Sequence, residues 1–157
     1  MSLTWKRRVL MICLCLPVAT PCLRSGHYAE ERTTPLEGDA AEVEVFEHFE
    51  PDTFRLEVKL YTNRTYTLKE APEYLLGQPF VRSAIDRTGF RCTQEGLVTL
   101  LTPDPAHPRA CSLYEQLEAA GFVRIIEPQV FQLFGEAEYD RVRVYQKRLE
   151  QGGEYRL

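Results

Sequence analysis

Several features that would identify a function are missing from this sequence. Its five cysteines include no Cys-x-x-Cys pair, so neither a zinc knuckle nor a dithiol redox site is indicated. None of its nine glycines belongs to a glycine-rich phosphate loop. No internal repeat or heptad pattern is visible, so a solenoid or a coiled coil is not indicated either. The sequence therefore names neither a substrate nor a reaction.

An excess of basic residues is also missing. The chain has 19 Lys and Arg against 23 Asp and Glu, a formal net charge of −4. Residues 1–22 contain Lys6, Arg7 and Arg8 and no acidic residue, so the rest of the chain has 16 basic and 23 acidic residues and a net charge near −7. This charge disfavours nucleic acids and anionic membranes as partners, and it is compatible with neutral ligands or cations.

No hydrophobic run is long enough to span a bilayer comfortably. The 12 residues from Val9 to Thr20 are mostly apolar and follow the basic residues Lys6 to Arg8. Because a membrane-spanning helix needs about 20 such residues, the pattern predicts a signal peptide or N-terminal anchor over residues 1–22. Cleavage after Ala19, cleavage at Cys22, lipidation of Cys22 and retention as an anchor are the open alternatives. We expect a secreted, periplasmic or cell-envelope protein that meets the membrane only through this segment if it is uncleaved.

The remaining length fits one folded domain. The chain has 157 residues, of which 44% are hydrophobic, as in globular proteins. Residues 23–40 are mostly polar and contain proline and glycine without periodicity, which predicts a flexible tether. Residues 41–157 form the predicted domain.

Short segments of alternating polarity, separated by turn residues, dominate this domain. The clearest is 54–60, which we expect to pair as a hairpin with a strand at 42–46. The continuous apolar run at 97–102 predicts a strand buried on both faces. Further strands are expected at 60–68, 78–82, 90–93, 122–126, 129–134, 139–149 and 155–157.

The turns and the one helix have recognisable signals. Pro72 breaks the extended run that begins at Leu60, and Gly77 allows a turn before the next strand. Ser112 and Glu115 fit a capping box and Gly121 lies where a helix would end, which predicts a helix near 112–120. The predicted fold class is mostly β: an antiparallel β-sandwich of about eight strands with one short α-helix.

From Leu60 onward, short motifs follow one another in a set order. They are Asn63-Arg64-Thr65-Tyr66, Ala71-Pro72, Leu75-Leu76-Gly77, Phe80-Val81-Arg82, Gly96-Leu97-Val98, Gly121-Phe122, Val144-Tyr145-Gln146-Lys147 and Gly153-Glu154-Tyr155. This order resembles a small β-sandwich accessory module of secreted bacterial proteins, often appended to carbohydrate-active enzymes, esterases and sulfatases. The chain departs from that pattern at Ala71, where valine is usual, and at Gln78, where an aromatic residue is frequent.

The resemblance implies a non-catalytic module that binds or presents a glycan or an envelope protein, without a cofactor. The alternative from another class is a small secreted hydrolase acting on polysaccharide or cell-wall material. A hydrolase would require titratable residues to converge in a cleft. The candidates are His48, Asp86, Glu95, His107 and Asp140.

Four residues at the start of these motifs are the candidate ligand-binding set. Asn63 and Arg64 offer amide and guanidinium donors to sugar hydroxyls, and Tyr61 and Tyr66 offer rings on which a sugar could stack. The alternative is structural, with Arg64 bonded to main-chain carbonyls and the tyrosines in the core. No catalytic residue and no metal ligand is predicted, because the acidic residues around His48 fit a solvated turn.

Two cysteines belong to the domain. In an oxidising compartment Cys92 and Cys111 predict a disulfide that closes a loop of about 20 residues. Two separate buried thiols are the alternative, and Cys22, if it is retained, could pair with either cysteine.

Overall fold

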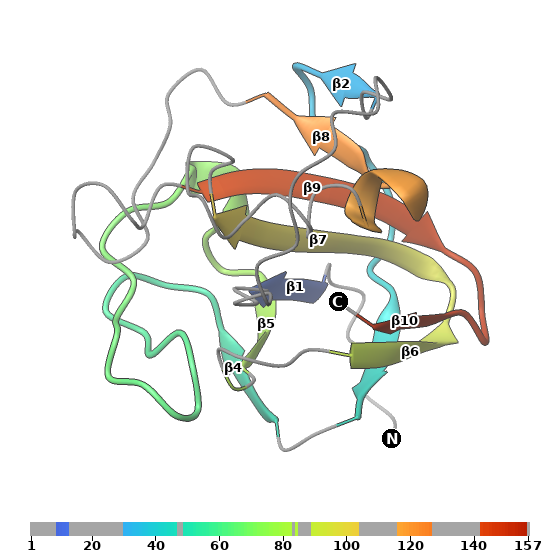
Figure 1. The fold of residues 1–157 in the computed structure, drawn as a ribbon. Coiled ribbons are helices and arrows are strands. Elements are labelled where there is room, and N and C mark those ends of the chain that lie inside the picture. The colour runs from blue at the N-terminus through green and yellow to red at the C-terminus, as the bar shows by residue number, and fades with distance from the viewer. Residues whose placement is uncertain are drawn as a thin grey trace, which may run out of the picture.

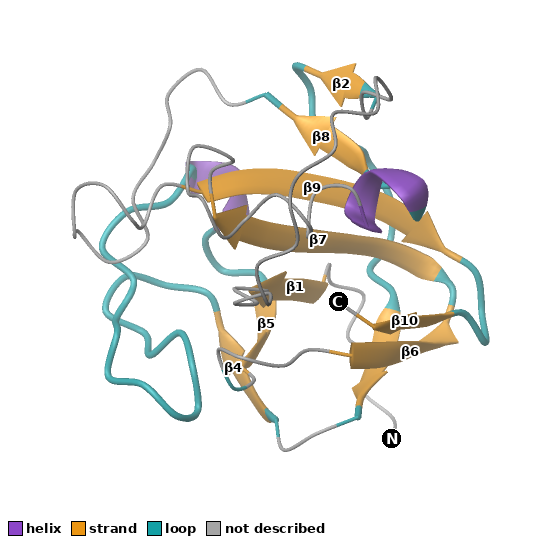
Figure 2. Ribbon diagram, viewed as in Figure 1, coloured by secondary structure: helices purple, strands orange, loops and turns teal. Residues whose placement is uncertain are grey.

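The computed structural model describes residues 9–12, 30–46, 49–82, 84, 89–103, 116–126 and 142–156. In this part of the chain there are ten strands in two sheets, with short helical segments beside them (Figures 1 and 2). The predicted fold class, mostly β with antiparallel pairing and a short helix, is therefore confirmed.

The larger sheet has seven strands in the order β2-β8-β9-β7-β1-β5-β4. Their bounds are β1 Val9–Ile12, β2 Glu31–Arg32, β4 Glu50–Thr53, β5 Pro79–Arg82, β7 Gly96–Pro103, β8 Val123–Ile125 and β9 Val142–Leu149. The antiparallel pair of β7 and β9 is its longest, running from Gly96 opposite Leu149 to Pro103 opposite Val142. Strand β1 is parallel to both β5 and β7, and β2 is parallel to β8. The alternation in the sequence did not predict these parallel pairs, because parallel partners are distant along the chain.

The smaller sheet has three antiparallel strands in the order β10-β6-β3. Their bounds are β3 Glu42–Val45, β6 Gly89–Gln94 and β10 Glu154–Arg156. Strands are thus present at 42–45, 79–82, 89–94, 96–103, 123–125, 142–149 and 154–156, close to the predicted ranges. The strand predicted at 129–134 lies outside the described residues.

The two central strands, β7 and β9, are buried on both faces. Leu100 and Tyr145 belong to a core shared with the smaller sheet, whereas their neighbours Leu101 and Val144 belong to a second core on the opposite face. This alternation follows from the two-residue repeat of a strand. The prediction that this run is buried on both faces is confirmed for 97–101, the part of it whose side chains the structure describes.

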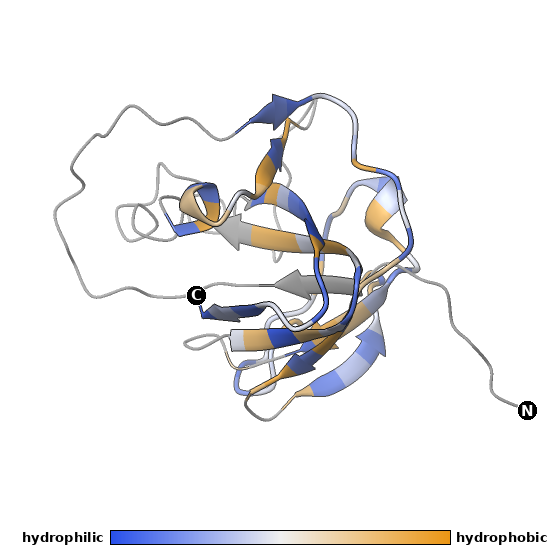
Figure 3. Cartoon of the chain, turned by 90° about the vertical axis from the view of Figure 1, so that its right-hand side faces the viewer, coloured by the Kyte–Doolittle hydropathy of each residue, from blue (hydrophilic) through white to orange (hydrophobic). Residues whose placement is uncertain are grey.

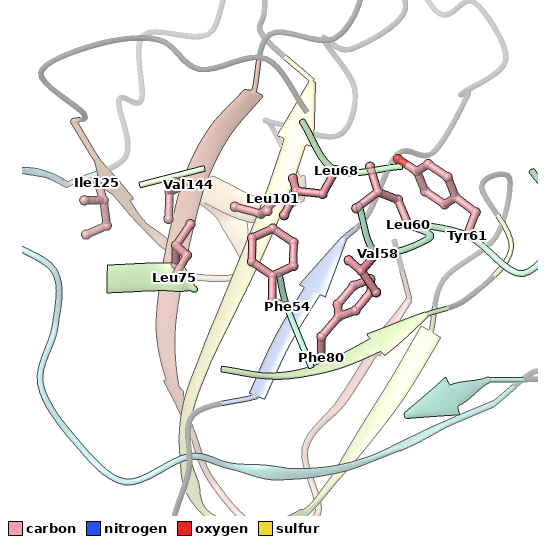
Figure 4. Close-up of a cluster of buried hydrophobic side chains, with 10 residues drawn as sticks. All are labelled: Phe54, Val58, Leu60, Tyr61, Leu68, Leu75, Phe80, Leu101, Ile125 and Val144. Carbon is pink, nitrogen blue, oxygen red and sulfur yellow. The ribbon is translucent and has the colours of Figure 1, made fainter. Parts of the chain in front are cut away.

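The second core is covered by a long connection rather than by a sheet. Side chains from 54–75 converge on Leu101, Ile125 and Val144 (Figure 4). They are Phe54, Val58, Leu60, Tyr61, Leu68 and Leu75, and Phe80 of β5 joins them. The larger sheet is therefore the middle layer between the smaller sheet and this connection.

The strand and hairpin predicted at 54–60 are wrong. The backbone turns at Glu57, which has a φ of 63°, and the amide of Val58 donates to the carbonyl of Arg55 (3.1 Å). Beyond the turn, residues 58–60 bond residues 66–68 irregularly, with an isolated bridge between Lys59 and Thr67. The strand predicted at 60–68 is accordingly absent, and β3 pairs with β6 instead. Phe54, Val58 and Leu60 are buried in this connection without a strand ladder, whereas Leu56, at the turn, is 52% exposed.

The turns predicted at Pro72 and Gly77 are present in the structure. Pro72 precedes the 3₁₀-helix η1 Glu73–Leu75, and Gly77 follows with a φ of 78°. Helical residues occur at 116–119, within the predicted 112–120, and residues 112–115 lie outside the described part. At the end of this helix the amides of Gly121 and Phe122 donate to the carbonyls of Glu118 and Leu117, the paired bonds of a Schellman motif.

Residues 30–40, the second half of the predicted tether, are bonded to the larger sheet. Strand β2 pairs with β8, and the amide of Leu97 donates to the carbonyl of Asp39 (2.7 Å). The amide of Leu36 donates to the buried side-chain oxygen of Gln146 (2.7 Å), whose nitrogen donates to the hydroxyl of Thr99 (3.0 Å). A buried amide side chain on β9 therefore anchors this segment.

Replacing that amide tests the anchor. In Gln146→Leu the amide of Leu36 and the hydroxyl of Thr99 lose their partner, so we expect the free energy of unfolding to fall by about 2 kcal/mol. Adding Thr99→Val should recover part of the lost stability, because the Gln146–Thr99 hydrogen bond is then replaced by two apolar side chains. Urea unfolding of the four-member mutant cycle measures both effects. Additive losses in the double variant would contradict the shared bond.

Strand β1 lies inside the segment predicted as a signal peptide. In Figure 1 it lies between β5 and β7, in the interior of the larger sheet. Cleavage of residues 1–22 stays a prediction. Such cleavage would remove this strand from the sheet.

Candidate functional site

The four residues predicted to bind a ligand are divided between core and surface. Tyr61 is fully buried, and Tyr66 is half-buried and packs edge-on against it, with ring centroids 6.3 Å apart. Asn63 and Arg64 are exposed in the same loop, and the Arg64 guanidinium donates to the carbonyl of Asn63 (2.9 Å). The loop thus presents polar groups to solvent, but its Tyr61 ring is not available for stacking on an external sugar.

Of the five residues considered for a hydrolase, Glu95 is the one among the described residues. His48, Asp86, His107 and Asp140 lie outside the described residues, and Glu95 is exposed between β6 and β7. Among the described residues no group of three or more His, Cys, Asp or Glu side chains could hold a metal ion. Within that same part of the chain, no helix is long and apolar enough to cross a membrane.

The disulfide predicted between Cys92 and Cys111 stays a prediction, because only Cys92 is among the described residues. Cys92 is a buried free thiol on β6, and its sulfur lies 3.0 Å from the carbonyl oxygen of Gln94. Burial raises the pKa of this thiol, which keeps it protonated and able to donate to that carbonyl. Cys111 lies outside the described residues.

An exposed aromatic ring instead marks the outer side of the smaller sheet. Phe46, directly after β3, is 40% exposed, although it is one of the large hydrophobic residues. The guanidinium of Arg156 on β10 lies 5.5 Å from the ring centroid, and that of Arg91 on β6 lies 6.0 Å from it. We call the group Glu44, Phe46, Arg91, Glu154 and Arg156 the Phe46 face.

Strand register brings these five residues together. Glu44 pairs with Arg91, which pairs on its other side with Glu154. In the adjoining row Gly89 pairs with Arg156, and its carbonyl accepts the amide of Phe46 (2.9 Å). Adjacent rows on one side of an antiparallel sheet are close enough for their side chains to touch.

Gly89 is the reason that the ring can lie across the middle strand. A Cβ atom at this position would come within 2.9 Å of the Phe46 ring, so any other residue would displace it. A ring that covers a strand glycine restores contacts that the missing side chain cannot make. The edge strand β10 is held beneath by Tyr155, which stacks on buried Phe90 with centroids 5.2 Å apart. In Figure 3 this strand, next to the C-terminal label, is coloured mostly as hydrophilic.

The charges of the Phe46 face balance. Two guanidinium groups stand beside two carboxylates, and the Arg91 guanidinium contacts Glu154 Oε1 through Nη2 at 2.5 Å and Nε at 2.9 Å. Both side chains of this pair are about half exposed, so solvent screens the attraction and it adds little stability. The face therefore offers adjacent hydrogen-bond donors and acceptors without a net charge.

Shifted pKa values occur away from this face. Burial raises the pKa of Tyr145 in the core to about 12. The hydrogen bond from Lys69 lowers the pKa of the exposed Glu57 carboxyl. Both shifts accompany structural contacts rather than a cleft of converging titratable groups.

The sequence contains a signal for the exposure of Phe46. In the run Glu42-Val43-Glu44-Val45-Phe46 the two-residue repeat places Val43 and Val45 inward, so Phe46 falls on the same side as the glutamates. An aromatic residue on the polar side of a strand is a better surface candidate than one inside an apolar run. The arginines could not be added from the sequence, because they come from strands 45 and 110 positions further on.

Comparison of the chain with protein-family models, with curated proteins and with solved structures found no match.

Proposed function

We propose that this chain is a non-catalytic module of a secreted or cell-envelope protein and that it binds a neutral glycan on the Phe46 face. The observation that carries the proposal is the half-exposed ring of Phe46 beside two arginines, with Glu44 and Glu154 paired in register with Arg91. A sugar ring has an apolar side that packs on an aromatic ring and hydroxyls around its edge. Each hydroxyl both donates and accepts, which suits alternating guanidinium and carboxylate groups.

The charge of the face supports a neutral ligand over a polyanion. Two positive and two negative groups cancel, and the chain beyond residue 22 has a net charge near −7. An anionic polymer would be repelled at long range by that charge. The basic and apolar N-terminal segment and the motif order from Leu60 onward support the accessory-module class and an extracytoplasmic location.

Replacing the ring tests the site. We expect Phe46→Ala to weaken binding of the glycan by about tenfold, since stacking on an aromatic ring contributes roughly 1 kcal/mol or more. The matched control is Phe49→Ala, because Phe49 is 39% exposed and is not part of the Phe46 face. The measurement is a glycan array with the unaltered chain, followed by titration of the best ligand against both variants.

The same series can reject the proposal. Binding of no neutral glycan by the unaltered chain would contradict the ligand class, and equal loss in both variants would contradict the site. A panel of polysaccharide hydrolase substrates is run beside the array. Release of product by the chain would contradict the non-catalytic assignment.

A further inference from the structure

Strand β1 reaches the interior of the larger sheet from the N-terminal end of the chain. It lies between β5 and β7 and is parallel to both (Figure 1). Val9 to Ile12 pair in register with Val98 to Leu101 of β7, and Leu10 and Met11 pair with Phe80 and Val81 of β5. In the described part of the sheet, β1 is the strand that joins β7 to β5.

The residues on both sides of this position are mostly apolar and buried, with Thr99 as the polar exception. On the β7 side, Val98 to Leu101 are all buried, and on the β5 side Phe80 is buried and Val81 half-buried. Strands with both faces covered have continuous apolar sequences, and Val-Leu-Met-Ile is such a sequence. The position therefore selects an extended, uncharged, apolar segment.

An empty position would be costly. The facing edges of β5 and β7 would each present main-chain N–H and C=O groups without partners beside buried side chains. Each such group costs roughly 1–3 kcal/mol when it is left unsatisfied, and an exposed apolar edge promotes association with other chains. Strand addition from a separate segment satisfies both edges at once.

We propose that the gap between β5 and β7 is a strand-acceptor site and that its ligand is the N-terminal segment Val9–Ile12 of the same chain. The segment thus has a structural role besides the predicted signal-peptide role, and cleavage after residue 22 would leave the site open to an apolar peptide of the same kind. This inference is independent of glycan binding on the Phe46 face.

The test starts from the whole chain, purified with residues 1–22 intact. A protease recognition sequence is inserted between Ser25 and Gly26, and the chain is cut under native conditions. The probe is a labelled synthetic peptide of residues 6–12, Lys-Arg-Arg-Val-Leu-Met-Ile, whose basic end keeps it soluble. The control peptide carries Met11→Pro, which removes one N–H from the strand and fixes its φ.

We expect the cut N-terminal piece to stay with the rest of the chain on gel filtration and to exchange with the labelled peptide. The Met11→Pro peptide should bind at least about tenfold more weakly, because it leaves a facing carbonyl unsatisfied. Washing the N-terminal piece away could also make the cut chain precipitate. The site would be supported if the unaltered peptide prevented this precipitation and the Met11→Pro peptide did not.

Other results overturn the proposal. The first is that the two peptides bind equally well or prevent precipitation equally well. The second is that the N-terminal piece is lost from a chain that stays soluble and takes up no peptide. Amide exchange on the uncut chain gives a second measurement. Residues 9–12 should be protected like β7, and free exchange there would contradict a strand in the sheet.

Discussion

Gly96→Ala should lower the free energy of unfolding by about 3 kcal/mol or more. Gly96 begins β7 with a φ of 157°, and a Cβ atom there would lie 2.5 Å from Ala40 C, Ala40 O and Ala41 N. These are main-chain atoms, which cannot rotate away as a side chain can. Overpacking a buried contact costs roughly 1–3 kcal/mol, and an unfavourable backbone conformation adds a similar amount.

The contact that Gly96 permits is the one that holds 39–41 against the sheet. The amide of Ala41 donates to the carbonyl of Leu97 (3.0 Å), and the amide of Leu97 donates to the carbonyl of Asp39 (2.7 Å). Displacing Ala40 would strain both bonds and also move buried Ala41 in the core. We therefore expect amide protection to fall at Ala41 and Leu97 before it falls elsewhere in β7.

Gly152→Ala is the matched control for Gly96→Ala. Gly152 also has a positive φ, 85°, but a Cβ there would meet no atom within 4 Å. In this variant the free energy of unfolding should fall only by the cost of placing alanine in the left-handed conformation, about 1 kcal/mol. Urea unfolding compares the two. Equal losses would mean that the approach of Ala40 to Gly96 contributes nothing to stability.

How far the fold was predictable depends on whether a signal is local. β7 and β9 are predicted well because Leu97 to Leu101 and Val144 to Leu149 carry their burial in their own sequence. The turn at Gly77 and the helix end at Gly121 are predicted for the same reason, since each needs a positive φ. The prediction failed at 54–60 because period-2 alternation does not show which strand, if any, lies alongside, and the turn at Glu57 leaves Leu56 exposed.

The apolar segment Val9–Ile12 shows a second limit. Four apolar residues after a basic cluster fit the apolar part of a signal peptide and equally fit a strand buried on both faces. Composition is the same in the two cases; the pairing with β5 and β7 identifies the strand, and the signal peptide stays a prediction. The Phe46 face was hidden in a similar way, because Arg91 and Arg156 reach Phe46 only through the pairing of three strands.

Phe80→Ala should lower the free energy of unfolding by about 3–5 kcal/mol. Phe80 is buried where three parts of the fold meet. It pairs in register with Asp52 of β4 and Leu10 of β1, and its ring packs edge-on against Phe54 of the covering connection, with centroids 5.5 Å apart. Removal of the ring leaves a cavity between the sheet and the connection, which closes only in part.

Phe49→Ala and Phe54→Ala complete the experiment on Phe80. Phe49 is 39% exposed, so the same deletion there should cost less than about 1 kcal/mol, and the difference from Phe80→Ala measures burial. Combining Phe80→Ala with Phe54→Ala should give a coupling of about 0.5–1.5 kcal/mol, because the two rings touch. Urea unfolding of the set supplies every value. Equal losses at Phe49 and Phe80, or strict additivity with Phe54, would mean that this core does not hold the connection to the sheet.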